Sequence, residues 1–410
     1  MFWLDSPAHA RWLESHTDQL LAFGRPSASP RSGFAWLNEK GRPERTRPVE
    51  LWITARQTHV YALGALLGRP GCATLVDHGI AALTGPFADP VNGGWYSSVT
   101  WDGDPLDTSK EAYTHAFVIL AASSAVAAGR PGAEALLEAA LANSDRYFWE
   151  EPAGAVVEGW DQGFANLDSY RGANANMHTT EAYLAAADVT GLDIWRERAL
   201  RIMSRLIDTE AKAAGWRIPE HYNSDWVSLP DYNRELPEDR FRPYGVTPGH
   251  GMEWSRLVLE ARAALGEAAP AWMLQAAQGL FARALQDGWS EGGQPGFCYT
   301  TDFEGRAVVR LRLHWVAAEA TGAAATAYRA TGDPQYAEWY QTWWEYVANN
   351  VIDHEHGSWH HELSPQGRVS SEMWPGKPDL YHAVQATLIP RLPLAPSFAT
   401  ALARGLLGRT

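Results

Sequence analysis

The sequence predicts an all-α fold, an (α/α)6 barrel in which six inner and six outer helices alternate, with short β-hairpins at one end. Three observations predict it. A hairpin-like motif recurs about every sixty residues, two helix-like stretches follow each hairpin, and the first helix of each pair is the more apolar. Because no linker rich in Pro, Gly or Ser divides the chain, we expect a single catalytic domain over residues 1–410.

The hairpin motif has a glycine or alanine, an aromatic or apolar residue, alternating polar and apolar positions, and turn residues. It occurs at residues 33–43, 92–105, 153–163, 214–226, 295–306 and 357–368. The interval from Trp216 to Phe297 is longer than the others, at 81 residues. A long loop over residues 231–249, before the fourth inner helix, explains that difference.

The helical stretches between the hairpins have apolar residues at three- and four-residue spacing. A helix that is apolar nearly all round is buried, whereas an amphipathic helix faces water on one side. The inner helices are therefore expected at residues 49–68, 111–129, 174–191, 250–266, 312–332 and 377–390. Their more charged outer neighbours are expected at residues 72–85, 134–148, 193–208, 270–286 and 334–350.

Composition excludes several functional classes. With 34 basic against 48 acidic residues, the net charge of −14 opposes binding to nucleic acid or to an anionic membrane. The sequence has no apolar run long enough to span a bilayer, and its first residues do not resemble a signal peptide. Cys72 and Cys298 are too few for a disulfide framework and are expected to be buried. We therefore expect a cytoplasmic protein, monomeric or homodimeric.

Histidines mark the expected functional site. Six of the 14 fall one on each inner helix, at positions 59, 115, 178, 250, 314 and 382. All but His59 lie near the helix start, so a closed ring gathers them at one mouth. His59 and His115 are interpreted as structural. The others have polar companions, and the polar residues of these helices are Arg56, Tyr113, Asn174, Asn176, Glu181, Glu253, Glu319 and Gln385.

The polar residues are compatible with a metal site, a pair of catalytic carboxylates, or acid-base catalysis by histidine. A metal site is disfavoured because the His-Glu pairs lack a tight ligand motif, and the histidines of residues 353–363 are expected to be largely solvated. A glycoside hydrolase needs two carboxylates, which Glu181, Glu253 and Glu319 can supply. So many histidines instead favour proton transfer near neutral pH. The 20 Trp residues fit either a sugar-binding pocket or core packing, so a sugar-binding protein or scaffold without turnover also stays open.

Several motifs, in this order along nearly the whole chain, resemble the N-acylglucosamine 2-epimerase superfamily, and within it the aldose-ketose isomerase branch. They are "WITARQTHVYA", "KEAYTHAFVILA", "NANMHTTEAYLAA", "PGHGMEWSRL", "LHWVAAEA" and "KPDLYHAVQA". The resemblance implies an (α/α)6 barrel, a monosaccharide substrate, and neither metal nor other cofactor. It also implies interconversion of D-mannose and D-fructose, with D-lyxose and D-xylulose as a further pair.

The resemblance also implies the roles of individual residues. His382 transfers a proton between C2 and C1 through a cis-enediol, while His250, held by Glu253, assists ring opening and proton movement between O1 and O2. Arg56 stabilises the enediolate. The substrate is bound by Tyr113, Asn174, His178, Trp315 and Glu319. A sugar 2-epimerase of the cellobiose or N-acylglucosamine type is the alternative. So is a sulfoquinovose isomerase, in which Arg56 and one of Arg234, Arg240 and Arg242 meet the sulfonate.

Overall fold

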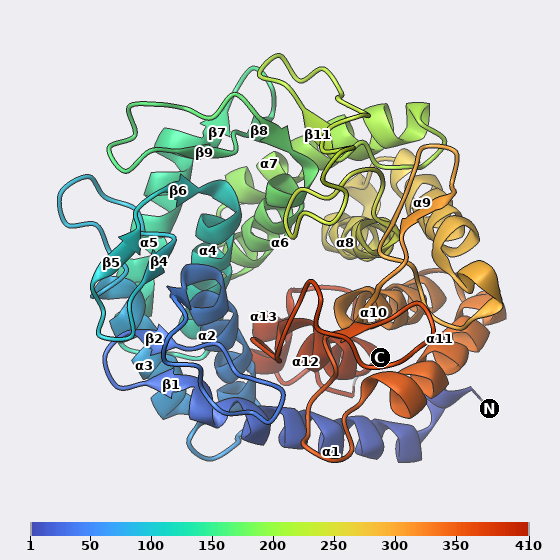
Figure 1. Ribbon diagram of the computed structural model, residues 1–410, viewed down its shortest axis with the longest axis horizontal. Coiled ribbons are helices and arrows are strands. Elements are labelled where there is room, and N and C mark those ends of the chain that lie inside the picture. Colours follow the sequence, from blue (N-terminus) through green and yellow to red (C-terminus); the bar gives the residue numbers. More distant parts are fainter. Residues whose placement is uncertain (1, 409–410) are drawn as a thin grey trace.

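The computed structural model describes residues 2–408 and confirms the predicted (α/α)6 barrel (Figure 1). Six helices surround the centre of the ring and six lie outside them. The inner helices are α2 (Leu51–Leu66), α4 (Ala112–Ala127), α6 (Ala173–Thr190), α8 (Pro248–Leu265), α10 (His314–Thr331) and α12 (Tyr381–Leu388). The outer helices are α1 (Pro7–Gly24), α3 (Cys72–Thr84), α5 (Ala133–Asn143), α7 (Asp193–Met203), α9 (Trp272–Gly288) and α11 (Pro334–Tyr346).

The ring is closed by contacts between the N-terminal and C-terminal parts of the chain. The sequence pattern did not reveal this closure. Five outer helices follow their inner helices as predicted, but the sixth, α1, comes from the N-terminal segment and packs against α12. The last helix, α13 (Phe398–Ala403), instead contacts α2, α4 and α6. The chain after α12 therefore covers one end of the ring.

The inner helices are buried nearly all round, as their apolar sequences predict, and their side chains form much of one large hydrophobic core. Gly191 and Gly332, both at φ 71°, end α6 and α10 in the left-handed conformation that glycine adopts without strain. Cys72 and Cys298 are buried and unpaired. Within residues 2–408, no helix combines the length and the apolar character needed to cross a membrane.

The strands are only two or three residues long. They are β1 (Ala28–Ser29), β2 (Gly33–Phe34), β3 (Val49–Glu50), β4 (Ser98–Val99), β5 (Pro105–Asp107), β6 (Lys110–Glu111), β7 (Trp149–Glu150), β8 (Ala155–Val156), β9 (Gly159–Trp160), β10 (Arg171–Gly172), β11 (His221–Tyr222), β12 (Thr300–Thr301), β13 (Ala307–Val309), β14 (Arg312–Leu313) and β15 (Glu362–Leu363). Strand β4 pairs with β5, which begins at the last residue of the predicted hairpin 92–105, and β12 pairs with β13, which directly follows the predicted hairpin 295–306.

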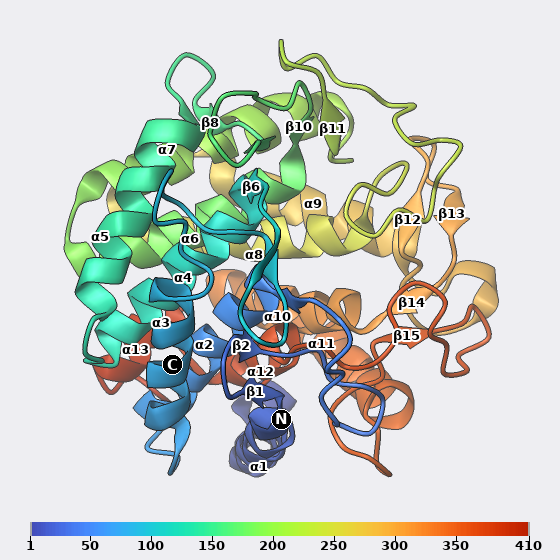
Figure 2. The ribbon, with the colours of Figure 1, turned by 60° about the vertical axis from the view of Figure 1, so that its left-hand side comes forward.

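Other pairs join one repeat to the next: β3 with β4, β6 with β9, β10 with β11, and β14 with β15. Lys377 N donates to Leu37 O at 2.8 Å and links the last repeat to the first. These pairings immediately precede the inner helices, so they fix the helix starts around the mouth. Figure 2 shows β12 to β15 and the loop before α8 on one side of the molecule, and α13 on the other.

Candidate active site

The inner-helix starts and the loop before α8 surround a cavity of about 670 Å³. Its lining contains most of the residues that the sequence predicted. The predicted residues in the lining are Arg56, Tyr113, Asn174, His178, His250, Glu253, Trp315 and His382. Glu319, predicted to bind substrate, does not line the cavity. The expectation that the histidines converge on one mouth is therefore met by His178, His250, His314 and His382, and not by His59 and His115.

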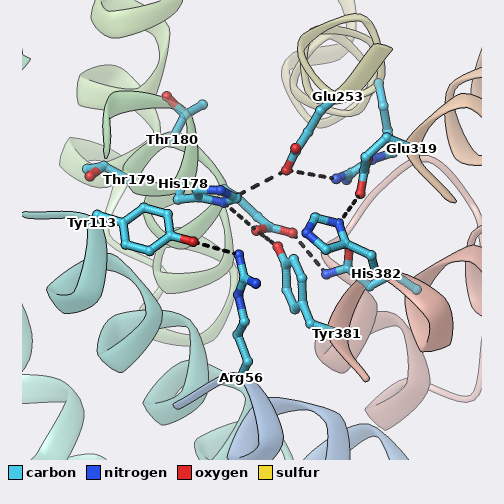
Figure 3. Close-up of polar contacts among 12 residues, drawn as sticks. Arg56, Tyr113, His178, Thr179, Thr180, Glu253, Glu319, Tyr381 and His382 are labelled. Carbon is cyan, nitrogen blue, oxygen red and sulfur yellow. Dashed lines mark hydrogen bonds and ion pairs between the residues drawn. The ribbon is translucent and has the colours of Figure 1, made fainter. Parts of the chain in front are cut away.

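His382 is held by the buried carboxylate of Glu319 (Figure 3). Nδ1 of His382 lies 2.9 Å from Glu319 Oε1, and the other carboxylate oxygen accepts from Arg256 Nε at 3.0 Å. With Glu319 ionised, Nδ1 carries the proton and Nε2 is the free base. Burial, followed by the nearby positive charge of Arg56, lowers the pKa of His382 well below its usual value. Glu319 therefore orients the imidazole of His382 and does not itself line the cavity.

His250 is held by a different carboxylate from the one predicted. Its Nδ1 lies 2.9 Å and 3.0 Å from the two carboxylate oxygens of Glu220, a buried residue directly before β11. Glu253 points elsewhere: its Oε1 lies 3.8 Å from His178 Nδ1 and 3.7 Å from Arg256 Nη2. The prediction that Glu253 holds His250 was wrong. Although the two residues are three apart on one helix, His250 pairs with Glu220 from the hairpin segment.

Glu253 and Glu319 are buried side chains that both lie against the Arg256 guanidinium, at the bottom of the cavity. Burial and the proximity of Glu319 raise the pKa of Glu253 well above its usual value, and burial also raises the pKa of Glu319. Two sets of ligand-type atoms lie close enough to hold a cation, one on His178, Glu181 and Glu253, the other on Glu253, Glu319 and His382. The Arg256 guanidinium already provides a positive charge beside these carboxylates. Arg256, Glu253 and Glu319 thus form a buried arginine-carboxylate cluster.

Arg56 brings a second buried positive charge to the cavity. It donates to Tyr113 Oη at 3.0 Å and to Asp379 Oδ2 at 3.3 Å. Its guanidinium carbon lies 4.2 Å from the ring centroid of Phe117 and 4.8 Å from that of Tyr381. Aromatic faces and one carboxylate therefore fix this cation in place.

Trp315 lies between the two histidines. Its ring centroid is 5.3 Å from that of His250 and 5.7 Å from that of His382. Gly249 makes room for it: a methyl group at that position would come within 2.5 Å of the indole. The half-buried indole thus gives the cavity a flat apolar surface flanked by two imidazoles.

Sequence reasoning missed several lining residues. His361 was expected to be solvated but is buried, and its ring stacks on that of His314 at 3.6 Å between centroids. His354 is exposed and His356 and His360 are half-buried, so the expectation of solvation is met in full only by His354. The other additions are Trp52 on α2 and residues outside the helices, namely Phe241, Pro243, Tyr299, Trp374, Pro378 and Asp379. Arg240, one of the three loop arginines considered for a sulfonate, also lines the cavity.

His59 and His115 have structural partners, as predicted. His115 Nδ1 donates to Glu111 O at 2.8 Å, and its Nε2 accepts from Trp95 N at 3.2 Å. His59 Nδ1 lies 2.7 Å from Ser124 Oγ, deeper in the barrel. Neither ring lines the cavity at the inner-helix starts.

Residues 33–386 match the model of the N-acylglucosamine 2-epimerase (GlcNAc 2-epimerase) family. The chain belongs to this family. Among relatives, it is 50% identical to a D-mannose isomerase of Pseudomonas cannabina pv. alisalensis, covering 98% of this chain and 97% of the relative. It is 48% identical to a D-mannose isomerase of Thermobifida fusca, covering 98% of each. A crystal structure of a D-mannose isomerase matches with a TM-score of 0.87 and 29% identity, covering 94% of this chain and 99% of that one.

Proposed function

We propose that the chain is an aldose-ketose isomerase that interconverts D-mannose and D-fructose. The observation that carries the proposal is the pair His250 and His382, each with Nδ1 held by a buried carboxylate, on either side of Trp315 in one cavity. A histidine held in this way keeps Nε2 available for proton transfer. The two relatives named D-mannose isomerase, similar over nearly their whole length, support a monosaccharide substrate.

In this proposal, Nε2 of His382 removes the proton from C2 of the open-chain aldose. The electrons of that bond form the C1–C2 double bond of a cis-enediol, and His382 returns a proton to C1 on the same face. His250 assists ring opening and moves the proton between O2 and O1. A base must be neutral to accept a proton, and the lowered pKa of His382 keeps it neutral at pH 7.

Arg56 supplies positive charge where the enediolate develops, a form of preorganised stabilisation that contributes strongly to catalysis. Tyr113, Asn174, His178 and Trp315 line the same cavity and are proposed to contact the sugar. Glu253 stays in the proposed site as a buried acid beneath the substrate. No step of this scheme requires a metal or another cofactor.

The other candidate reactions differ in the groups that they need. A glycoside hydrolase needs two carboxylates flanking one bond. Of the three predicted glutamates only Glu253 lines this cavity, and the other lining carboxylate, Asp379, is paired with Arg56. A 2-epimerase needs acid and base on opposite faces of C2, so its product separates it from an isomerase. Arg240 lines the same cavity as Arg56, which favours sulfoquinovose as a second sugar to test.

Product analysis tests the proposal. The purified protein is incubated with D-mannose, D-lyxose, cellobiose and sulfoquinovose in parallel, with and without a metal chelator. We expect D-fructose from D-mannose at an unchanged rate in chelator. D-glucose as the product supports an epimerase, and activity that is lost in chelator and restored by added metal contradicts the metal-free scheme. His382→Ala, checked for folding by circular dichroism, is expected to abolish turnover.

A further inference from the structure

Arg256 lies beneath His382 and is connected to it through one carboxylate. Its side chain on α8 is fully buried, and its Nε donates to Glu319 Oε2 at 3.0 Å. The other oxygen of Glu319 accepts from His382 Nδ1 at 2.9 Å. On its far side, Nη1 of Arg256 donates to Glu260 Oε2 at 3.1 Å. The guanidinium is thus two hydrogen bonds away from the imidazole of His382.

The surroundings of Arg256 are crowded with acidic groups. Glu181 and Glu253 approach it together with Glu260 and Glu319. Burial raises the pKa of Glu260 to about 7 and also raises that of Glu319, and in both cases the positive charge of Arg256 opposes the rise. An unpaired charge in such a buried place is strongly disfavoured. Arg256 is therefore the cation best placed to keep Glu319 ionised.

The charge of Glu319 decides which nitrogen of His382 is protonated. A carboxylate only accepts hydrogen bonds, so His382 must donate to it through Nδ1, which leaves Nε2 unprotonated. A protonated Glu319 can donate instead, and Nδ1 would then accept and the proton of the neutral ring would move to Nε2. The charged and titratable groups near His382 and Glu319 include Arg56, Arg256, His178, His314, His361, Glu181, Glu253, Glu260 and Asp379. Of these, Arg256 donates directly to Glu319.

We propose that Arg256 is a positioning residue: by holding Glu319 as a carboxylate, it fixes His382 in the tautomer with its proton on Nδ1 and a free base at Nε2. The use of Nε2 in catalysis rests on the proposed isomerase function. The tautomer is a property of the resting protein, so it is measured without turnover.

Nitrogen NMR of protein labelled with ¹⁵N-histidine measures the tautomer directly, with the His382 signals assigned by their loss in His382→Asn. At pH 7.5 the wild type and Arg256→Lys are expected to show the Nδ1–H tautomer, and Arg256→Met to lose it. Arg198→Met is the matched control, since Arg198 is a buried arginine on outer helix α7 that pairs with Asp145. A folded Arg256→Met protein that keeps the Nδ1–H tautomer overturns the proposal.

If Arg256→Met does not fold, the combination Arg256→Met with Glu260→Gln removes opposite charges together and is measured in the same way. Kinetics add a second readout. Arg256→Met is expected to lower kcat on the order of 10²-fold, the size of one acid-base contribution, with KM changed by less than about threefold. In a Glu319→Gln background, the same substitution should lower kcat by less than about threefold, because the two residues act as one unit.

Equal losses of kcat in both backgrounds would contradict a role through Glu319. A wild-type protein that does not convert D-mannose refutes the proposed function but leaves the NMR result on Arg256 fully interpretable. The failure of one proposal is therefore distinguishable from the failure of the other.

Discussion

The Nδ1 atom of His250 lies 2.9 Å from Oε1 of Glu220, thirty residues earlier in the chain. Glu220 comes from the segment before β11, which pairs with β10 at the start of α6. His382 is held in the same way by Glu319 from a neighbouring inner helix. Each of the two imidazoles proposed for catalysis, His250 and His382, therefore has its own buried carboxylate, and neither carboxylate is Glu253.

Glu220→Gln is expected to lower kcat by roughly 10²-fold, because the amide no longer selects the Nδ1–H tautomer of His250. Glu253→Gln is the matched comparison, and its kcat should fall by less than about tenfold. The raised pKa of Glu253 favours its protonated form, which an amide resembles in shape. Steady-state kinetics with D-mannose measure both variants. A larger loss in Glu253→Gln than in Glu220→Gln would restore the helical pairing as the functional one.

His361→Ala is expected to lower kcat/KM by about tenfold or more, because its ring lines the cavity and stacks on His314. His356 lies five residues earlier on the same segment and is half-buried outside the cavity. His356→Ala serves as the control and should have nearly wild-type kinetics. Equal kinetics in the two variants would remove His361 from the site.

Trp315→Ala should raise KM by roughly tenfold, since the sugar loses the apolar surface between the two imidazoles. Gly249→Ala is expected to have a similar effect without touching Trp315, because the added methyl group pushes against the indole. Gly163→Ala is the control, as open space surrounds that position. A Gly249→Ala protein with wild-type KM would show that the position of the indole is unimportant.

Acid should destabilise the fold through its buried histidines. Burial lowers the pKa values of His59, His178 and His314 to about 4 each, from 6.5. The unfolded chain binds these protons first, so the stability that the neutral rings contribute is complete above pH 6.5 and is lost as the pH falls toward 4. His59→Asn should reduce the slope of unfolding free energy against pH by up to about 1.4 kcal/mol per pH unit. Urea unfolding between pH 4.5 and 7 measures the slope, and an unchanged slope would contradict the burial effect.

The alternation of inner and outer helices was predictable from the sequence, because the apolar pattern of each helix lies within its own residues. The origin of the sixth outer helix was not, since α1 reaches α12 only when the ring closes. Each predicted hairpin contains a short strand, but its partner strand lies wholly or partly outside the predicted range, and several strands pair with the preceding repeat. Long-range pairing of this kind leaves no periodic signal.

In the site, helical residues were predicted better than loop residues. Arg56, Tyr113 and His382 line the cavity because the helix starts converge there. Glu220 and His361 lie in hairpin segments, where the sequence indicates exposure and only the packed structure shows burial. Glu319 was identified as a site residue from its place on an inner helix and was expected to bind substrate, but its carboxylate pairs with His382. Helical spacing does not show which neighbour a side chain contacts.

The fate of the C2 hydrogen tests the central claim, proton transfer by His382 through an enediol, most directly. D-Mannose deuterated at C2 is converted in ordinary water, and the D-fructose is analysed by NMR for deuterium at C1. The account predicts fructose with only part of the label at C1, because an imidazole exchanges some of its proton with solvent, and no fructose from His382→Asn. Fructose formed by His382→Asn at a near wild-type rate, or glucose as the product, would contradict it.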